Sequence, residues 1–162
     1  MLKLTKEGTT DAFDWEVLEK GYKTQVKQDA ACFMHISDFS NLTNEGAQAN
    51  TGVWLDAEDD LDEVSSNLLQ VPAIAINFPI FADGRGFSIA QQLRMEKGYK
   101  GEIYAIGHFM EEQLFYLKRC GFDAFVIQHD TDVEPLKAIL NDFSNNYQGS
   151  PIEARPLFKR RT

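Results

Sequence analysis

The stretch AIAINFPIFADGRGFSIAQQLRMEKGYKGEIYAIG, residues 73–107, decides the fold class because it holds two apolar runs separated by a helical pattern. The runs are residues 73–78 and 103–107. The helix is predicted to start near Ser88, which can form a capping box with Gln91, and to end before Gly98. A strand, a helix and a second strand in this order are typical of a βαβ unit.

Similar patterns lie on both sides of this unit. Apolar runs predict further strands at residues 31–36, 52–56 and 124–128, and apolar residues at helical spacing predict helices over 110–121 and 133–143. Gly121 is predicted to cap the first of these helices, and Thr131 with Glu134 to form a capping box at the start of the second. Most strands are apolar on both faces, which favours a sheet covered by helices on both sides.

We therefore predict about five βα units that form a mainly parallel α/β sheet with helices on both faces, of the doubly wound, flavodoxin-like kind. An open half of a β/α barrel is the alternative. Residues 2–15 are predicted to add an N-terminal hairpin that bends at Glu7-Gly8. We expect a single domain over residues 1–147, and a basic C-terminal extension over residues 148–162.

Composition excludes several classes of function. The 162 residues carry a net charge of -9, which argues against a nucleic-acid partner. The chain has neither a signal peptide nor an apolar run of about 20 residues, so we expect a cytoplasmic protein without a membrane partner. Cys32 and Cys120 form no C-x-x-C pair, and no cofactor motif is present, so we expect neither a metal nor a cofactor.

One loop stands out as a candidate binding site. Asp83-Gly84-Arg85-Gly86 lies between a buried strand and the helix predicted from Ser88, so its amides and the Arg85 guanidinium are suited to hold a small anion. Arg94, further along the same helix, is a second candidate ligand of that anion. The alternative is that Asp83 and Arg85 pair with each other while both glycines serve the turn.

Other polar residues give weaker signals. His108 and His129 follow two predicted strands and are candidates for a metal site or for proton transfer, although a solvated or merely hydrogen-bonding role explains them better. His35 is interpreted as a hydrogen-bonded core imidazole, and the acids between Asp56 and Asp62 as a solvated loop. The two cysteines are interpreted as buried, inert thiols.

The blocks FPIFADGRGFS (78–88) and RCGFDAF (119–125) resemble a bacterial family of unknown function. Its members are described as oxidoreductases of sulfite reduction, because their genes accompany those of sulfite reductase. The resemblance covers the chain up to Tyr147 and adds weight to Asp83, Arg85, Arg94, Arg119 and Asp123. The chain departs from the family pattern where Tyr104 replaces an arginine and where His108 and Glu112 replace aspartates.

The resemblance implies an accessory or anion-binding protein linked to assimilatory sulfite reduction, with sulfite reductase as a partner. One alternative is a small α/β enzyme that acts on an anionic sulfur or phosphate compound, with Asp83 or His129 moving a proton. A second alternative is an interaction module that docks through its basic tail. The sequence leaves open whether the protein is an enzyme and whether it forms a homo-oligomer.

Overall fold

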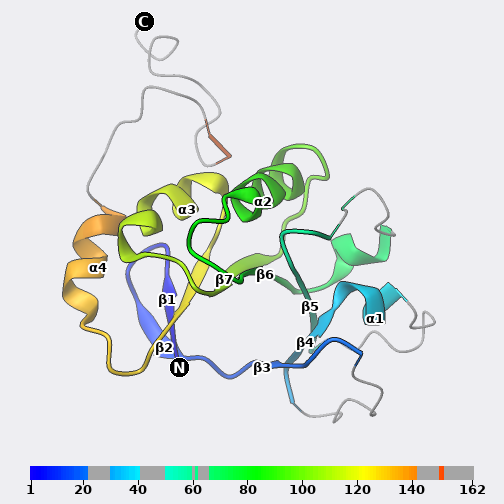
Figure 1. Cartoon of the computed structure of the whole chain (residues 1–162), viewed down its shortest axis with the longest axis horizontal. Coiled ribbons are helices and arrows are strands. Elements are labelled where there is room, and N and C mark those ends of the chain that lie inside the picture. Colours follow the sequence, from blue (N-terminus) through cyan, green and yellow to red (C-terminus); the bar gives the residue numbers. More distant parts are fainter. Residues whose placement is uncertain (22–29, 41–49, 60, 62–65, 142–149, 152–162) are drawn as a thin grey trace, which may run out of the picture.

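The sheet runs almost entirely in chain order (Figure 1). In the computed structural model, described for residues 1–21, 30–40, 50–59, 61, 66–141 and 150–151, eight strands form one sheet in the order β2-β1-β8-β7-β6-β5-β4-β3. Its strands are β1 (Leu2–Thr5), β2 (Thr10–Ala12), β3 (Glu16–Val17), β4 (Cys32–His35), β5 (Thr51–Leu55), β6 (Ala73–Phe78), β7 (Glu102–Gly107) and β8 (Ala124–Ile127). Strands β3 to β8 are parallel, whereas β1 pairs antiparallel with both β8 and β2.

The helices of the described residues pack on one face of this sheet. They are α1 (Ile36–Ser40), α2 (Arg85–Met95), α3 (Leu114–Cys120) and α4 (Val133–Leu140), with 3-10 turns η1 (Ser66–Gln70) and η2 (Glu111–Gln113). Buried residues of all four α-helices join one apolar cluster with alternate residues of the strands. The opposite face of the sheet has its own cluster, which contains no helical residue. Nowhere in the described segments is a helix both long and apolar enough to cross a membrane.

The prediction of helices on both faces of the sheet is therefore wrong. The predicted flavodoxin-like strand order is wrong as well. A doubly wound sheet reverses its strand order partway, whereas crossovers of one hand in a sheet that keeps chain order place every helix on the same side. The chain forms a curled half-barrel, as in the alternative, extended by the antiparallel hairpin β1–β2. The apolar pattern on both faces has another cause, which is the curling of the sheet.

The curl follows from one short connection. Strands β2 and β3 form opposite edges of the sheet, yet only residues 13–15 join them. A connection of this length spans at most about 14 Å, whereas the edges of a flat sheet of this size would lie about 34 Å apart. Figure 1 shows this connection running along the side of the sheet opposite to α2 and α3. The sheet therefore bends until its two edges approach each other.

Aromatic rings fill the concave face that results. The ring of Phe33 on β4 lies 5.5 Å from that of Tyr104 on β7, although strands β5 and β6 lie between β4 and β7 in the sheet. Trp15 stacks on Phe33 with 4.4 Å between ring centroids, and Phe13 lies 6.2 Å from Tyr104. Gly52 makes room for this contact, because a Cβ there would lie 2.6 Å from the Phe33 ring.

Capping, turn and periodicity signals in the sequence predicted the bounds of most helices and strands to within a few residues. The hairpin is confirmed, with Gly8 at φ 88°, and so is the left-handed cap Gly121 at φ 108°. Helix α2 begins at Arg85, before the predicted Ser88, and the N-cap of α4 is Asp132, which accepts a hydrogen bond from the Glu134 amide, and not Thr131. Apart from residues 150 and 151, the predicted C-terminal extension lies outside the described residues.

Candidate functional site

The candidate residues divide between the two ends of the sheet. The carboxyl ends of β4 to β8, here called the carboxyl rim, carry the loop Asp83-Gly84-Arg85-Gly86. The opposite end carries Arg94 and Asp123 around a surface hollow. Arg85 and Arg94 lie nine positions apart on α2, so about 14 Å of helix separates them at a rise of about 1.5 Å per residue. The two arginines therefore do not converge on one small anion.

At the carboxyl rim, Asp83 and Arg85 pair with each other. Arg85 Nη2 donates to Asp83 Oδ2 at 2.7 Å and Nε to Oδ1 at 3.0 Å, while Glu58 lies 3.6 Å from Nη2. Hydrogen bonds from Arg85 hold the pKa of the Asp83 carboxyl below its usual value. Oδ1 also accepts from the Arg85 amide at 3.1 Å, so a carboxylate of the chain itself already contacts the first turn of α2.

The remaining candidates at this end of α2 differ in environment, because Gly84 and Ser88 are exposed whereas Gly86 is buried. Gly86 is buried, and a Cβ at this position would lie 2.7 Å from the ring of Phe78, so the glycine lets α2 pack on β6. Ser88 is exposed on α2.

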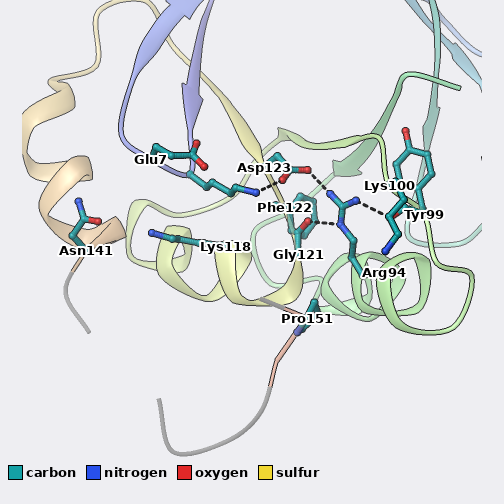
Figure 2. Close-up of a pocket in the computed structure, with 11 residues that line it drawn as sticks. Glu7, Arg94, Tyr99, Lys100, Lys118, Gly121, Phe122, Asp123, Asn141 and Pro151 are labelled. Atoms are coloured by element: carbon teal, nitrogen blue, oxygen red, sulfur yellow. Dashed lines mark hydrogen bonds and ion pairs between the residues drawn. The ribbon is translucent and has the colours of Figure 1, made fainter. Parts of the chain in front are cut away.

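At the amino end of the strands, Arg94 donates hydrogen bonds to three main-chain carbonyls (Figure 2). Its Nε donates to Gly121 O at 3.0 Å, and its Nη1 to Tyr99 O at 2.9 Å and Gly101 O at 2.8 Å. Its Nη2 donates to Asp123. Arg94 thereby ties the loop that follows α2 to the loop that follows α3, and its first role is structural.

Asp123 is the acceptor at the centre of this arrangement. Besides Arg94, it accepts from the Ile103 amide at 2.9 Å and from Lys6 Nζ at 2.6 Å. The side chains of Arg94 and Asp123 are 16% and 20% exposed, so the pair is largely shielded from water. The hairpin, α2 and β7 therefore meet at one carboxylate.

A hollow of about 850 Å³ opens over this pair. Figure 2 shows Lys118 and Lys100 on either side of Asp123, with Glu7 and Asn141 on the α4 side. The lining side chains include four cations, Lys6, Arg94, Lys100 and Lys118, and two carboxylates, Glu7 and Asp123. Positive charge thus prevails in this hollow, although the whole chain carries a net charge of -9. We call it the amino-end hollow.

Of the secondary candidates, Asp123 lines the amino-end hollow, whereas Arg119 and His129 do not. Arg119 lies in the last turn of α3 and is half-buried, and His129 is exposed beyond β8. His108 is exposed and lines a second hollow of about 380 Å³, together with Phe81, Phe109 and Met110. Within the described residues, neither histidine belongs to a group of three side chains able to hold a metal ion.

The structure instead assembles a cluster that the sequence interpretation missed. Ligand atoms of His35, Asp56 and Asp59 lie within 4.8 Å of one another at the carboxyl rim. His35 is buried, as predicted, but its Nε2 has no hydrogen-bond partner among the described residues, and Asp59 is only 17% exposed. The alternation of strand residues was the available signal, because it places His35, Asp56 and Asn77 on the same face of the sheet.

Both cysteines are free and buried, and burial raises the pKa of each thiol. Their interpretation as inert thiols agrees with this environment, because a thiol that stays protonated is a poor nucleophile.

Two buried tyrosines predict a loss of stability in alkali. Burial is the main cause that raises the pKa of Tyr104 to about 12, and burial also raises that of Tyr99. Since the unfolded phenol ionises near pH 10.0, the unfolded state gives up these protons first, and stability should fall as the pH rises from 10 to 12. Because the chain has five tyrosines, only the last part of the phenolate absorbance should appear together with the change in circular dichroism; full ionisation near pH 10 with the fold intact would contradict this.

The chain has a match among protein families but none among characterised proteins. The model of a family described as "Bacterial protein of unknown function (DUF934)" matches residues 52–158, more than half of the chain. No curated protein and no solved structure matches it.

Proposed function

The chain belongs to this bacterial family of unknown function (DUF934), and from that premise we propose that it is an accessory, anion-binding protein of assimilatory sulfite reduction. The link to sulfite reduction comes from the family resemblance of the blocks at residues 78–88 and 119–125. We propose further that the anion binds in the amino-end hollow. The observation that carries this step is the excess of lysine and arginine in one hollow of an acidic protein.

Electrostatics favours the amino-end hollow over the carboxyl rim for an anion. A concave surface lined by one sign of charge raises the local concentration of ions of the opposite sign. Lys6 and Lys118 each make one interaction, with Asp123 and with Leu140 O, so further N–H donors of each ammonium group are available to a ligand. Arg85, by contrast, is paired with Asp83 and lies beside Glu58.

Calorimetric titration with sulfite, sulfate and phosphate tests the proposal. We expect the variant Lys100→Gln/Lys118→Gln to bind at least about tenfold more weakly than the natural chain, because two positive charges are removed while polar side chains only one atom shorter remain. Arg85→Ala is the control at the other end of the sheet and should change affinity by less than about twofold. Binding by the natural chain should also weaken as salt is added.

Other results of the titration would either move the anion site or overturn the proposal. Loss of binding in Arg85→Ala alone would move the anion to the loop Asp83-Gly84-Arg85-Gly86, which stays a prediction from the sequence. Failure of the natural chain to bind any of the three anions would overturn the proposed function. The thermal midpoint of each variant shows whether a loss of binding reflects unfolding.

The two alternative functions stay predictions. For the small enzyme, neither Asp83 nor His129 lines the amino-end hollow, so no acid–base group of that prediction meets the proposed anion. For the interaction module, the basic residues of the tail lie outside the described residues. Co-purification with sulfite reductase, with and without residues 149–162, separates the module from an anion-binding protein.

A further inference from the structure

We propose that His35, Asp56 and Asp59 bind a divalent cation of the first transition series, with Mn²⁺ or Zn²⁺ as the best candidates. The three residues come from the end of β4, the end of β5 and the loop beyond it, and meet at the carboxyl rim. In α/β barrels this end of the strands is where ligands bind. The proposal is independent of anion binding in the amino-end hollow, which lies at the other end of the sheet.

His35 is the first observation that points to a ligand. Its side chain is 0% exposed, and the ring packs edge-on against Trp54 with 4.5 Å between centroids. Nδ1 lies 2.8 Å from Ser37 Oγ, which holds the ring in place. Nε2 lies 3.2 Å from Asp59 Oδ2, but the oxygen is out of line with an N–H donor, and no hydrogen bond forms. A buried polar atom left unpaired destabilises the fold, so a ligand for this atom is expected.

The separation of these two atoms suits two ligands of one cation. Ligand atoms at about 2.1 Å from a metal and at angles of about 90–110° lie about 3.0–3.4 Å apart. The 3.2 Å between His35 Nε2 and Asp59 Oδ2 falls within this range. A lone pair on each atom that points toward a common cation also explains why the two do not form a straight hydrogen bond.

Neighbouring groups hold the carboxylates in position by hydrogen bonds, as groups around the ligands do in metal sites. Asn77 Nδ2 on β6 donates to Asp56 Oδ1 at 2.7 Å, and the Asp56 amide donates to Asp59 Oδ2 at 2.7 Å. Ser37 Oγ lies 2.8 Å from His35 Nδ1, and the Ser37 amide donates to the same atom at 3.2 Å. Metal binding therefore requires the tautomer in which Nδ1–H donates to Ser37 Oγ and the lone pair of Nε2 is left for the metal. Each of the three ligands is therefore anchored from a different part of the fold.

The charge and the donor set indicate the kind of cation. Asp56, Asp59, Glu58 and Asp83 gather at this part of the rim against the guanidinium of Arg85, so negative charge prevails. Mg²⁺ and Ca²⁺ prefer oxygen ligands only, whereas an imidazole nitrogen suits transition metals and zinc. Three protein ligands also leave coordination positions for water or for another ligand.

Manganese binding by the full-length, chelator-treated protein tests this site. We expect one Mn²⁺ per chain by calorimetry and by the loss of the free-ion paramagnetic resonance signal, with a higher thermal midpoint when Mn²⁺ is present. Asp56→Asn and Asp59→Asn, which keep the shape of each side chain, should each weaken binding by at least about tenfold. The matched controls Glu58→Gln and Asp83→Asn should change affinity by less than about twofold.

Two results would overturn the proposal. One is Mn²⁺ and Zn²⁺ binding by the natural chain that is no tighter than binding by the variant Asp56→Asn/Asp59→Asn. The other is an equal loss of affinity in Glu58→Gln, which would indicate diffuse attraction to an acidic surface. Lys100→Gln/Lys118→Gln should leave Mn²⁺ binding unchanged, and Asp56→Asn should leave sulfite binding unchanged, so this proposal and the proposed function fail separately.

Discussion

Replacing Arg94 with alanine is expected to lower the free energy of unfolding by about 3 kcal/mol or more, because it removes several charge-assisted hydrogen bonds at once. The change would leave the carbonyls of Tyr99, Gly101 and Gly121 without this donor. It would also leave Asp123, which is 20% exposed, with one cation fewer. Such a loss is a large part of the stability of an ordinary domain.

Urea unfolding of Arg94→Ala and Arg85→Ala measures this effect against a matched control on the same helix. Arg85 is 57% exposed and its ion pair lies at the surface, so its removal should change stability little. Arg94→Lys should remain well below the natural chain, since one ammonium group cannot reproduce the fork of a guanidinium. Equal stability of the two alanine variants would show that Arg94 is not a structural residue.

Gly52→Ala is expected to cost about 2–3 kcal/mol through overpacking of the concave face. The added Cβ would lie 2.6 Å from ring carbons of Phe33 and 2.9 Å from the carbonyl oxygen of Ala73. Phe33 cannot move aside freely, because Trp15 stacks on one side of it and Tyr104 meets its edge. We therefore expect the added methyl group to distort the curled sheet.

Thermal and urea unfolding of Gly52→Ala test the prediction, with Gly84→Ala as the control. A Cβ at Gly84 has only Phe87 within 4 Å, at 3.9 Å, and the backbone there has φ -79°, so this second change should be nearly neutral. Adding Phe33→Leu to Gly52→Ala should recover part of the loss, which a double-mutant cycle measures. A Gly52→Ala protein as stable as Gly84→Ala would mean that the concave face is not tightly packed.

The error about the two faces of the sheet has a simple physical origin. A strand that is apolar on both faces reports only that both faces are buried, and not by what. Here one face of β4 to β7 is covered by helices, and the other by Phe13, Trp15 and the curled sheet itself. A second layer of helices and a bent sheet therefore leave the same pattern in the sequence.

The partner of a candidate residue could be predicted from the sequence only where the two residues lie close together in the chain. The pairing of Asp83 with Arg85, given as the alternative for that loop, involves residues two positions apart and was visible in the sequence. The linking of Arg94 to Asp123 and to Gly121 O spans nearly thirty positions, and its residues were predicted only as separate candidates. The meeting of His35 with Asp56 and Asp59 had no signal except the alternation along their strands.

Local signals in the chain were enough to locate most strands and helices, the hairpin at Glu7-Gly8 and the cap at Gly121, because capping, turns and periodicity act over a few residues. The folded structure was needed to show which face the helices cover, how far the sheet curls, and which polar groups converge at its two ends. These features depend on contacts between residues far apart in the chain. Apolar burial drives those contacts, and because the hydrophobic effect is non-directional, the sequence of one segment does not specify which other segment covers it.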